Sequence, residues 1–283
     1  GDMMERAVYN ALLAAQPPDG RTLRYFTALE GKRTVFDRDT FCCPNNFRRV
    51  MAELPMMVYY RQAGGLAVNL YTASKAEIDL GDGLSLAVRQ ETDYPNSGDV
   101  LLTLDPSRPA AFPVSLRIPA WCKEATVSVN DQPIDLPVVP GTMLVIDRPW
   151  QSGDRVRLHM PMEFRLVKGR QLQSGRVAVL RGPVVFCLNP ARNESLAGVD
   201  LKEVTIDPAS LEGPVADDTI RPDGQACRVR AWSPGKWSPT AVADLTLLLT
   251  ELPDPGGELT HLKVPDGAAD GLVDDELMTT TTP

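Results

Sequence analysis

The feature that most constrains the fold is a long series of short strand-like segments between residues 56 and 167. These segments are rich in Val, Leu, Ile, Tyr and Phe, and several alternate apolar with polar residues, as in "LSLAVRQE" (84–91) and "DRVRLHM" (154–160). Turn signals separate them, among them Gly-Asp-Gly at 81–83 and Asn-Ser-Gly-Asp at 96–99. Short strands at close intervals with such turns predict an antiparallel meander that folds into a β-sandwich or a jelly-roll-like unit.

A second β unit is predicted to follow the first. Its apolar segments are "SGRVAVLRGPVVFCL" (174–188), "EVTI" (203–206), "QACRVRAW" (225–232) and "ADLTLLLTEL" (243–252). The stretch 189–224 is rich in Asp, Pro, Asn and Gly, which predicts a loop with little regular structure. The end of the chain, "GLVDDELMTTTTP", has a low-complexity tail that is expected to be poorly ordered.

The first 56 residues have a different pattern. Apolar residues recur at helical spacing over 2–15, with Asp2 as the expected N-cap, and "QPPDG" (16–20) ends that helix. A strand is expected over 22–29, and a second helix over 46–54 with Asn46 as its cap. The sequence thus predicts a mainly β fold of two antiparallel β-sandwich-like domains, 57–168 and 169–283, preceded by a short α-helical segment, 1–56.

The charge and cysteine content exclude several classes of protein. The net charge is −8 with a pI of about 4.9, which disfavours binding to nucleic acid. No apolar run reaches the about 18 residues that a membrane span needs, so no membrane partner is expected. The five cysteines are odd in number and irregularly spaced, unlike a disulfide framework. This favours a reducing compartment, the cytoplasm, with the periplasm as the alternative if a signal peptide lies upstream.

The stretch "FCCPNN" (41–46) is the clearest candidate for chemistry. A thiolate is both a nucleophile and a metal ligand, and the positive end of the helix expected after the pair would favour it. The residues alone leave three alternatives open. Cys42 and Cys43 are a metal or catalytic site, a strained vicinal disulfide, or two small buried residues at a bend.

The remaining candidates favour structural roles. Cys122, Cys187 and Cys227 lie in or beside apolar strand patterns, so they are expected to pack in the core. The only two histidines are His159, expected to face solvent, and His261, expected in a loop. The four tryptophans are expected to pack in the core or at edges rather than to form a sugar-stacking platform.

Six stretches together resemble glycoside hydrolase family 127, the β-L-arabinofuranosidase-like proteins. They are "ERAVYNALLA" (5–14), "FCCPNNFRRVMAELP" (41–55), "GGLAVNLYTAS" (64–74), "VSLRIPAWC" (114–122), "GDRVRLHMPM" (153–162) and "GRVAVLRGPVVFCLNP" (175–190). The resemblance implies an N-terminal (α/α)6 barrel followed by β-sandwich domains. Residues 1–56 would then be the C-terminal remnant of that barrel, with the double-cysteine loop.

The resemblance also implies a mechanism and a metal. In such enzymes the double cysteine binds zinc together with a glutamate and a further cysteine of the barrel, and a separate barrel glutamate is the acid/base. The first cysteine attacks the anomeric carbon, and water then releases the sugar with retained configuration. By this resemblance Cys42 is nucleophile and zinc ligand, Cys43 is a zinc ligand, and Tyr9 and Asn10 line the sugar pocket.

This chain departs from the family pattern in two respects. It has no equivalent of the other zinc ligands or of the acid/base, so zinc is expected to be absent and the chain alone inactive. Pro44-Asn45-Asn46 stands where many relatives have two prolines before one asparagine. The expected function is a portion of a retaining hydrolase of arabinofuranoside-type glycans. The alternative is a non-catalytic β-domain fragment with a structural, sugar-binding or dimerisation role, including a homodimer through the β domains.

Overall fold

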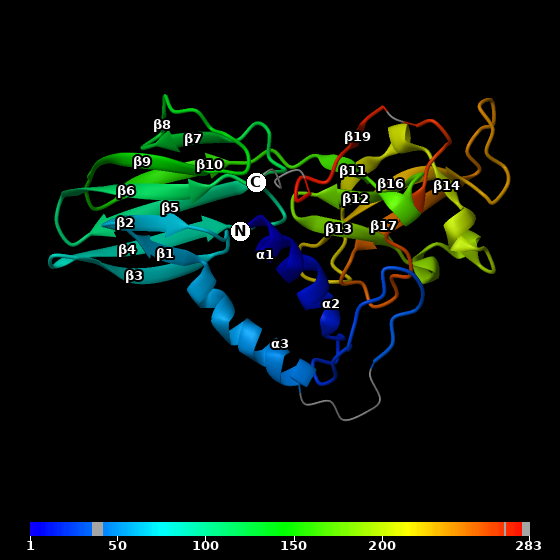
Figure 1. The fold of residues 1–283 in the computed structure, drawn as a ribbon, viewed down its shortest axis with the longest axis horizontal. Coiled ribbons are helices and arrows are strands. Elements are labelled where there is room, and N and C mark those ends of the chain that lie inside the picture. Colours follow the sequence, from blue (N-terminus) through cyan, green and yellow to red (C-terminus); the bar gives the residue numbers. More distant parts are fainter. Residues whose placement is uncertain (36–41, 269, 279–283) are drawn as a thin grey trace. The chain divides into compact units, whose positions relative to one another are not determined.

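The computed structural model describes residues 1–35, 42–268 and 270–278, and its fold is mainly β with helical segments ahead of the strands (Figure 1). The predicted fold class is therefore confirmed. Contacts group the chain into two compact units, Gly1–Glu5 with Asn45–Met162, and Arg6–Pro44 with Glu163–Pro283. The predicted division into 1–56, 57–168 and 169–283 stays a prediction. The final five residues of the predicted tail lie outside the described residues.

Helical structure is concentrated in the first 57 residues. It comprises α1 (Asp2–Arg6), a π-helical turn η1 (Ala7–Leu12), α2 (Leu13–Ala15), α3 (Cys42–Glu53) and a 3₁₀ turn η2 (Leu54–Met57). The first three elements follow one another without a break, as the helical spacing predicts. The π-helical turn was not predicted, because a single extra residue in a turn leaves almost no periodic signal.

Two sheets form the first unit. One has the strand order β1-β2-β6-β9, with bounds Tyr59–Gln62, Gly65–Val68, Ala110–Arg117 and Met143–Trp150. The other has the order β3-β4-β5-β10-β7-β8, with bounds Ser74–Gly81, Leu84–Thr92, Asp99–Pro106, Asp154–His159, Thr126–Val129 and Gln132–Pro133. All pairings are antiparallel except β2 with β6, which are parallel.

Alternating burial fixes which face of each sheet points inward. Along β4, Leu86 and Val88 are buried, whereas Ala87 and Arg89, which alternate with them, are exposed. Strand β10 alternates in the same way. In the other sheet, Leu66 and Leu116 are fully buried. One apolar row from each sheet therefore faces a common interior, as in a β-sandwich.

The outer strands of this sandwich carry features that interrupt pairing. Strand β3 has a register shift between Asp79 and Gly81, and β8 is only two residues long and ends at Pro133. On the other sheet, β9 contains Pro149, and β1 is four residues long. Short strands, bulges and proline are common where a sheet ends.

The second unit contains one nine-stranded sheet that closes on itself. Its path is β13-β17-β16-β14-β18-β12-β11-β19, with β15 paired to β16 and with β12 also paired to β13. The bounds are β11 Phe164–Lys168, β12 Arg176–Arg181, β13 Val184–Leu188, β14 Thr205–Ile206, β15 Glu212–Ala216, β16 Gln225–Trp232, β17 Leu245–Glu251, β18 Leu262–Lys263 and β19 Leu272–Val273. The enclosed core is apolar and includes Val179, Phe186, Ile206 and Leu249.

The segment 189–224 and its surroundings contain short 3₁₀ turns rather than long loops. They are η3 (Gln171–Gln173), η4 (Pro190–Arg192), η5 (Glu194–Leu196), η6 (Leu201–Glu203) and η7 (Pro208–Ser210). Asn189, Asp200 and Asp207 each cap one of these turns by accepting a hydrogen bond from the backbone two residues later. This is the local bonding that favours Asn and Asp at turns.

Two local predictions are wrong. The strand over 22–29 does not form, and among residues 1–35 the structure shows one β pairing, an isolated bridge between Glu30 and Leu259. Asp2 does not cap its helix, because its carboxylate instead accepts hydrogen bonds from Arg117 and from the Ala120 backbone. Among the described residues no helix is both long and apolar enough to span a membrane.

Candidate functional site

Cys42 and Cys43 are the first two residues of helix α3. The helix predicted over 46–54 therefore begins earlier, and the prediction that Asn46 caps it is wrong, because Asn46 lies inside the helix. Pro44 is compatible with this start, because its missing N–H lies in the first turn, where backbone N–H groups have no acceptor within the helix. Phe41, the first residue of the motif, lies outside the described residues.

The two thiols lie side by side. Their sulfur atoms are 3.5 Å apart, Cys42 is exposed and Cys43 is half-buried. Both thiols are free, so the pair does not form a disulfide, and neither residue is buried in a core. The contact with the Cys42 thiol raises the pKa of Cys43 above its ordinary value. A neighbouring cation would act in the opposite direction, since it stabilises a thiolate.

The donor set suits one soft cation. Two thiolates bound to the same tetrahedral zinc at about 2.3 Å are about 3.8 Å apart, close to the sulfur separation seen here. Cys42 and Cys43 therefore fit as two ligands of such an ion. Within 1–35, 42–268 and 270–278, no group of three or more His, Cys, Asp or Glu side chains gathers around a common point.

Tyr9 and Asn10 both lie in the π-helical turn η1. The Asn10 side chain is 4% exposed, and its amide nitrogen donates to the carbonyl oxygens of Arg6 and Pro183 at 2.6 and 2.8 Å. Its oxygen accepts a hydrogen bond from the Val185 N–H at 2.7 Å. Tyr9 is partly buried against the apolar core of the second unit. Asn10 thus ties the helix to the start of β13, and the predicted sugar contacts of Tyr9 and Asn10 stay predictions.

Cys122, Cys187 and Cys227 are buried, as predicted for core residues. Burial raises the pKa of the Cys122 thiol and of the Cys187 thiol to about 11 each, and also raises that of Cys227. His159 is exposed, as predicted, and its Nδ1 lies 2.8 Å from an Asp99 carboxylate oxygen.

A buried ionic cluster in the first unit was not predicted. The Arg117 side chain is 6% exposed and donates to Asp2 at 2.5 Å and to Glu5 at 2.6 Å. Its Nε donates to the Asn69 carbonyl oxygen, and its guanidinium lies 5.4 Å from the ring centre of Tyr71. Burial by itself lowers the pKa of Arg117, but the negative charges around it, that of Glu5 above all, more than reverse this, so the net pKa is raised.

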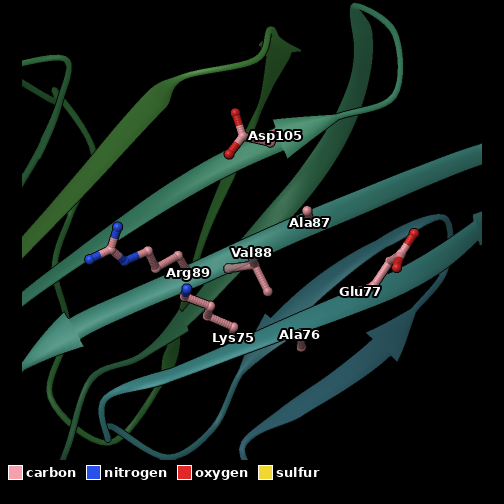
Figure 2. A pocket seen from close by; sticks show the side chains of 7 residues that line it. All are labelled: Lys75, Ala76, Glu77, Ala87, Val88, Arg89 and Asp105. Carbon is pink, nitrogen blue, oxygen red and sulfur yellow. The ribbon is translucent and has the colours of Figure 1, made fainter.

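A second unpredicted feature is a charged hollow on the outer face of strands β3, β4 and β5, with a volume of about 450 Å³ (Figure 2). Figure 2 shows Ala87 between Glu77 and Asp105, with Lys75 and Arg89 further along the strands. The available sequence signal was only a small residue, Ala87, at an outward position two residues before Arg89. Register between strands was needed to bring these residues together.

Sequence profiles of one family match two parts of the chain. The profile described as the catalytic domain of GH127 β-L-arabinofuranosidase matches residues 1–56, and that of the GH127 middle domain matches residues 65–162. Together they cover more than half of the chain. The match to the catalytic domain includes Tyr9, Asn10 and both adjacent cysteines.

Characterised and solved relatives agree with the profiles. The non-reducing end β-L-arabinofuranosidase of Bifidobacterium longum subsp. longum is 29% identical over 219 residues, covering 68% of this chain and 32% of the relative. A GH127 β-L-arabinofuranosidase from Geobacillus stearothermophilus T6 is 27% identical with a TM-score of 0.80, over 93% of this chain and 46% of that one. A further GH127 β-arabinofuranosidase is 26% identical with a TM-score of 0.81, over 96% and 46%. The chain thus spans 32% of the Bifidobacterium relative and 46% of each of the two solved ones.

Proposed function

Because the chain belongs to glycoside hydrolase family 127, we propose that it is part of a retaining glycosidase that removes β-L-arabinofuranose or a similar pentofuranoside from glycans. The relatives' names supply the sugar, and the match of residues 1–56 to the catalytic domain supplies the link to this chain. The observation that carries the proposal is the pair of adjacent, accessible thiols at the start of α3.

In the proposed reaction Cys42 is the nucleophile. Its thiolate attacks the anomeric carbon and forms a C–S bond while the glycosidic C–O bond breaks, and the departing oxygen takes a proton from a general acid. Water then attacks the same carbon and gives a proton to the conjugate base of that acid, the C–S bond breaks, and the thiolate is regenerated. Two displacements at one carbon retain the configuration of the sugar. The exposure of Cys42 supports this role, since an attacking sulfur must be reached by the substrate.

Cys42 and Cys43 are the residues that would hold a zinc ion in this proposal. Bound zinc would keep thiols deprotonated near neutral pH. The 3.5 Å sulfur separation supports ligation by both residues. The remaining ligands and the acid/base are not assigned to residues of this chain.

Tyr9 and Asn10 are proposed to lie at the sugar pocket, on the helix that the catalytic-domain profile matches. The three hydrogen bonds of Asn10 to the backbone favour an indirect part for this residue. We expect it to hold the π-helical turn in place, so that Tyr9 is presented in one orientation.

The test combines zinc content with hydrolysis of an aryl β-L-arabinofuranoside. Wild type, Cys42→Ser and Cys43→Ser are compared in a complete enzyme that also supplies the remaining ligands and the acid/base, with Cys122→Ala as the control for a cysteine outside the site. We expect Cys42→Ser to abolish turnover and both serine variants to lower zinc content, while Cys122→Ala retains both properties. Full activity of Cys42→Ser would refute the nucleophile assignment.

A non-catalytic role is the second candidate, favoured by the extent of the β units. The catalytic-domain profile ends at residue 56, and all strands of the described part of the chain follow it, from β1 onward. In this case the chain has a structural, sugar-binding or dimerisation role. Stoichiometric zinc together with turnover by the 283-residue chain would exclude it.

A further inference from the structure

The charged hollow on strands β3, β4 and β5 has two chemically different ends. Ala87 is the small residue at its floor, and its cross-strand neighbours are Glu77 on one side and Asp105 on the other. Lys75, two residues before Glu77, is paired with Arg89, two residues after Ala87. Residues two apart on one face of a strand are separated by about 6.6–6.8 Å, so a cationic end and an anionic end lie one short step apart.

The cationic end is the more unusual of the two. Lys75 and Arg89 stand directly opposite each other on neighbouring strands, and like charges in this position destabilise a sheet. Arg89 is joined to Glu91 at 2.7 Å, but both side chains are about half exposed, where such a pair contributes little. The next residue across the sheet from Arg89 is the neutral Thr103. A ligand carboxylate between the two cations would remove their repulsion.

The anionic end offers hydrogen-bond acceptors. Asp105 already accepts bonds from the Ser152 hydroxyl at 2.7 Å and the Gly153 N–H at 2.9 Å, which hold its carboxylate in place. Glu77 is exposed on the opposite side of Ala87. Hydroxyl groups of a ligand can donate to such carboxylates, and charge-assisted hydrogen bonds of this kind are stronger than neutral ones.

A ligand that satisfies both ends carries a carboxylate at one end and hydroxyl groups at the other, within about the length of one sugar ring. We propose that this hollow binds an acidic saccharide, a uronic acid residue of a glycan, with its carboxylate between Lys75 and Arg89. Its hydroxyls donate to Glu77 and Asp105, and its ring lies over Ala87. A solvated sheet face, the alternative reading, predicts no preference for any sugar.

The test measures binding to the complete chain by titration calorimetry, with no need for catalytic activity. A negative result would therefore leave the proposed hydrolase function untouched, and loss of hydrolysis in a cysteine variant would leave this site untouched. The probes are methyl glucuronide, methyl glucoside and acetate. We expect methyl glucuronide to bind at least about tenfold more tightly than either other probe, because only it engages both ends.

Variants locate the site. Lys75→Gln and Arg89→Gln are each expected to weaken glucuronide binding about tenfold, the usual effect of losing one charge-assisted hydrogen bond. Ala87→Leu should abolish it by filling the floor of the hollow. The matched control is Arg157→Gln, which removes an exposed arginine from β10 of the same sheet, outside the hollow.

All four substitutions are at exposed positions, so circular dichroism should show an unchanged fold. Equal affinity for methyl glucuronide and methyl glucoside would overturn the proposal. Absence of glucuronide binding at millimolar concentration would also overturn it, as would glucuronide binding that survives in Arg89→Gln and Ala87→Leu.

Discussion

Arg117 is expected to be the most sensitive charged residue of the first unit. Arg117→Met keeps much of the side-chain volume but removes the cation that pairs with Glu5, whose side chain is only 1% exposed. The second oxygen of Glu5, Oε2, is buried and has no hydrogen-bond partner among the described residues, so the carboxylate depends on Arg117. Breaking one side of a buried ion pair costs about 3–5 kcal/mol.

The assay is hydrogen exchange followed by mass spectrometry, read on peptides that contain β6. The opening free energy of these amides is expected to fall by about 3–5 kcal/mol in Arg117→Met. In Arg117→Met/Glu5→Gln the buried charge is gone as well, and a large part of the loss should be recovered.

The control is an ion pair in the same unit that remains in water. Arg155 and Asp131 are 3.2 Å apart, with side chains 50% and 63% exposed. Arg155→Met should cost less than about 1 kcal/mol. The reasoning is refuted if Arg117→Met is no more costly than Arg155→Met, or if the double variant is less stable than Arg117→Met alone.

Three further predictions follow from features described above. Asn10→Ala leaves buried backbone groups without their hydrogen-bond partner, so it should lower the free energy of unfolding by about 1–3 kcal/mol for each such group. The control Asn45→Ala, at an exposed position, should lower it by less than about 0.5 kcal/mol, with both variants measured by urea titration. With a thiol-specific colorimetric reagent, Cys42 and Cys43 should react at once and the three buried thiols only after denaturation; a third fast thiol would contradict the burial described. Burial raises the pKa of Asp217, but hydrogen bonds from Arg192 and Thr219 outweigh this effect, so the net pKa is lowered from 3.8. The ionised Asp217 carboxylate therefore stabilises the folded state above pH 3.8, and this stabilisation is lost as the pH falls below that value. The difference in Tm between wild type and Asp217→Asn should therefore be present above pH 3.8 and shrink below it, and a difference that grows on acidification would show that the sign is wrong.

The strands could be predicted because their signal is local. In β4 and β10, alternation alone indicated both the strand and its inward face, and burial follows that alternation residue by residue. The predicted strand over 22–29 failed because alternation does not supply a pairing partner. In the described part of this region, the residue that does pair is Glu30, just after the predicted strand, and its partner Leu259 is more than two hundred residues away.

A candidate site could be predicted when its residues are neighbours in the sequence, and not when strand pairing brings them together. The adjacent cysteines were visible because both members of the pair are neighbours in sequence. The hollow was not, because Lys75 meets Arg89 and Ala87 meets Asp105 only through strand register. The Arg117 cluster was hidden for the same reason, since Asp2 and Glu5 are more than a hundred residues away from their partner.

The outer strands of the first unit also bear on how copies of this chain could associate. Backbone groups on an open sheet edge are a template on which another chain can add a strand, the route to fibrils and to strand-swapped assemblies. The bulge in β3, the proline in β9 and the two-residue length of β8 each shorten or interrupt that template. These interruptions disfavour association of two copies of the first unit by edge-to-edge strand pairing.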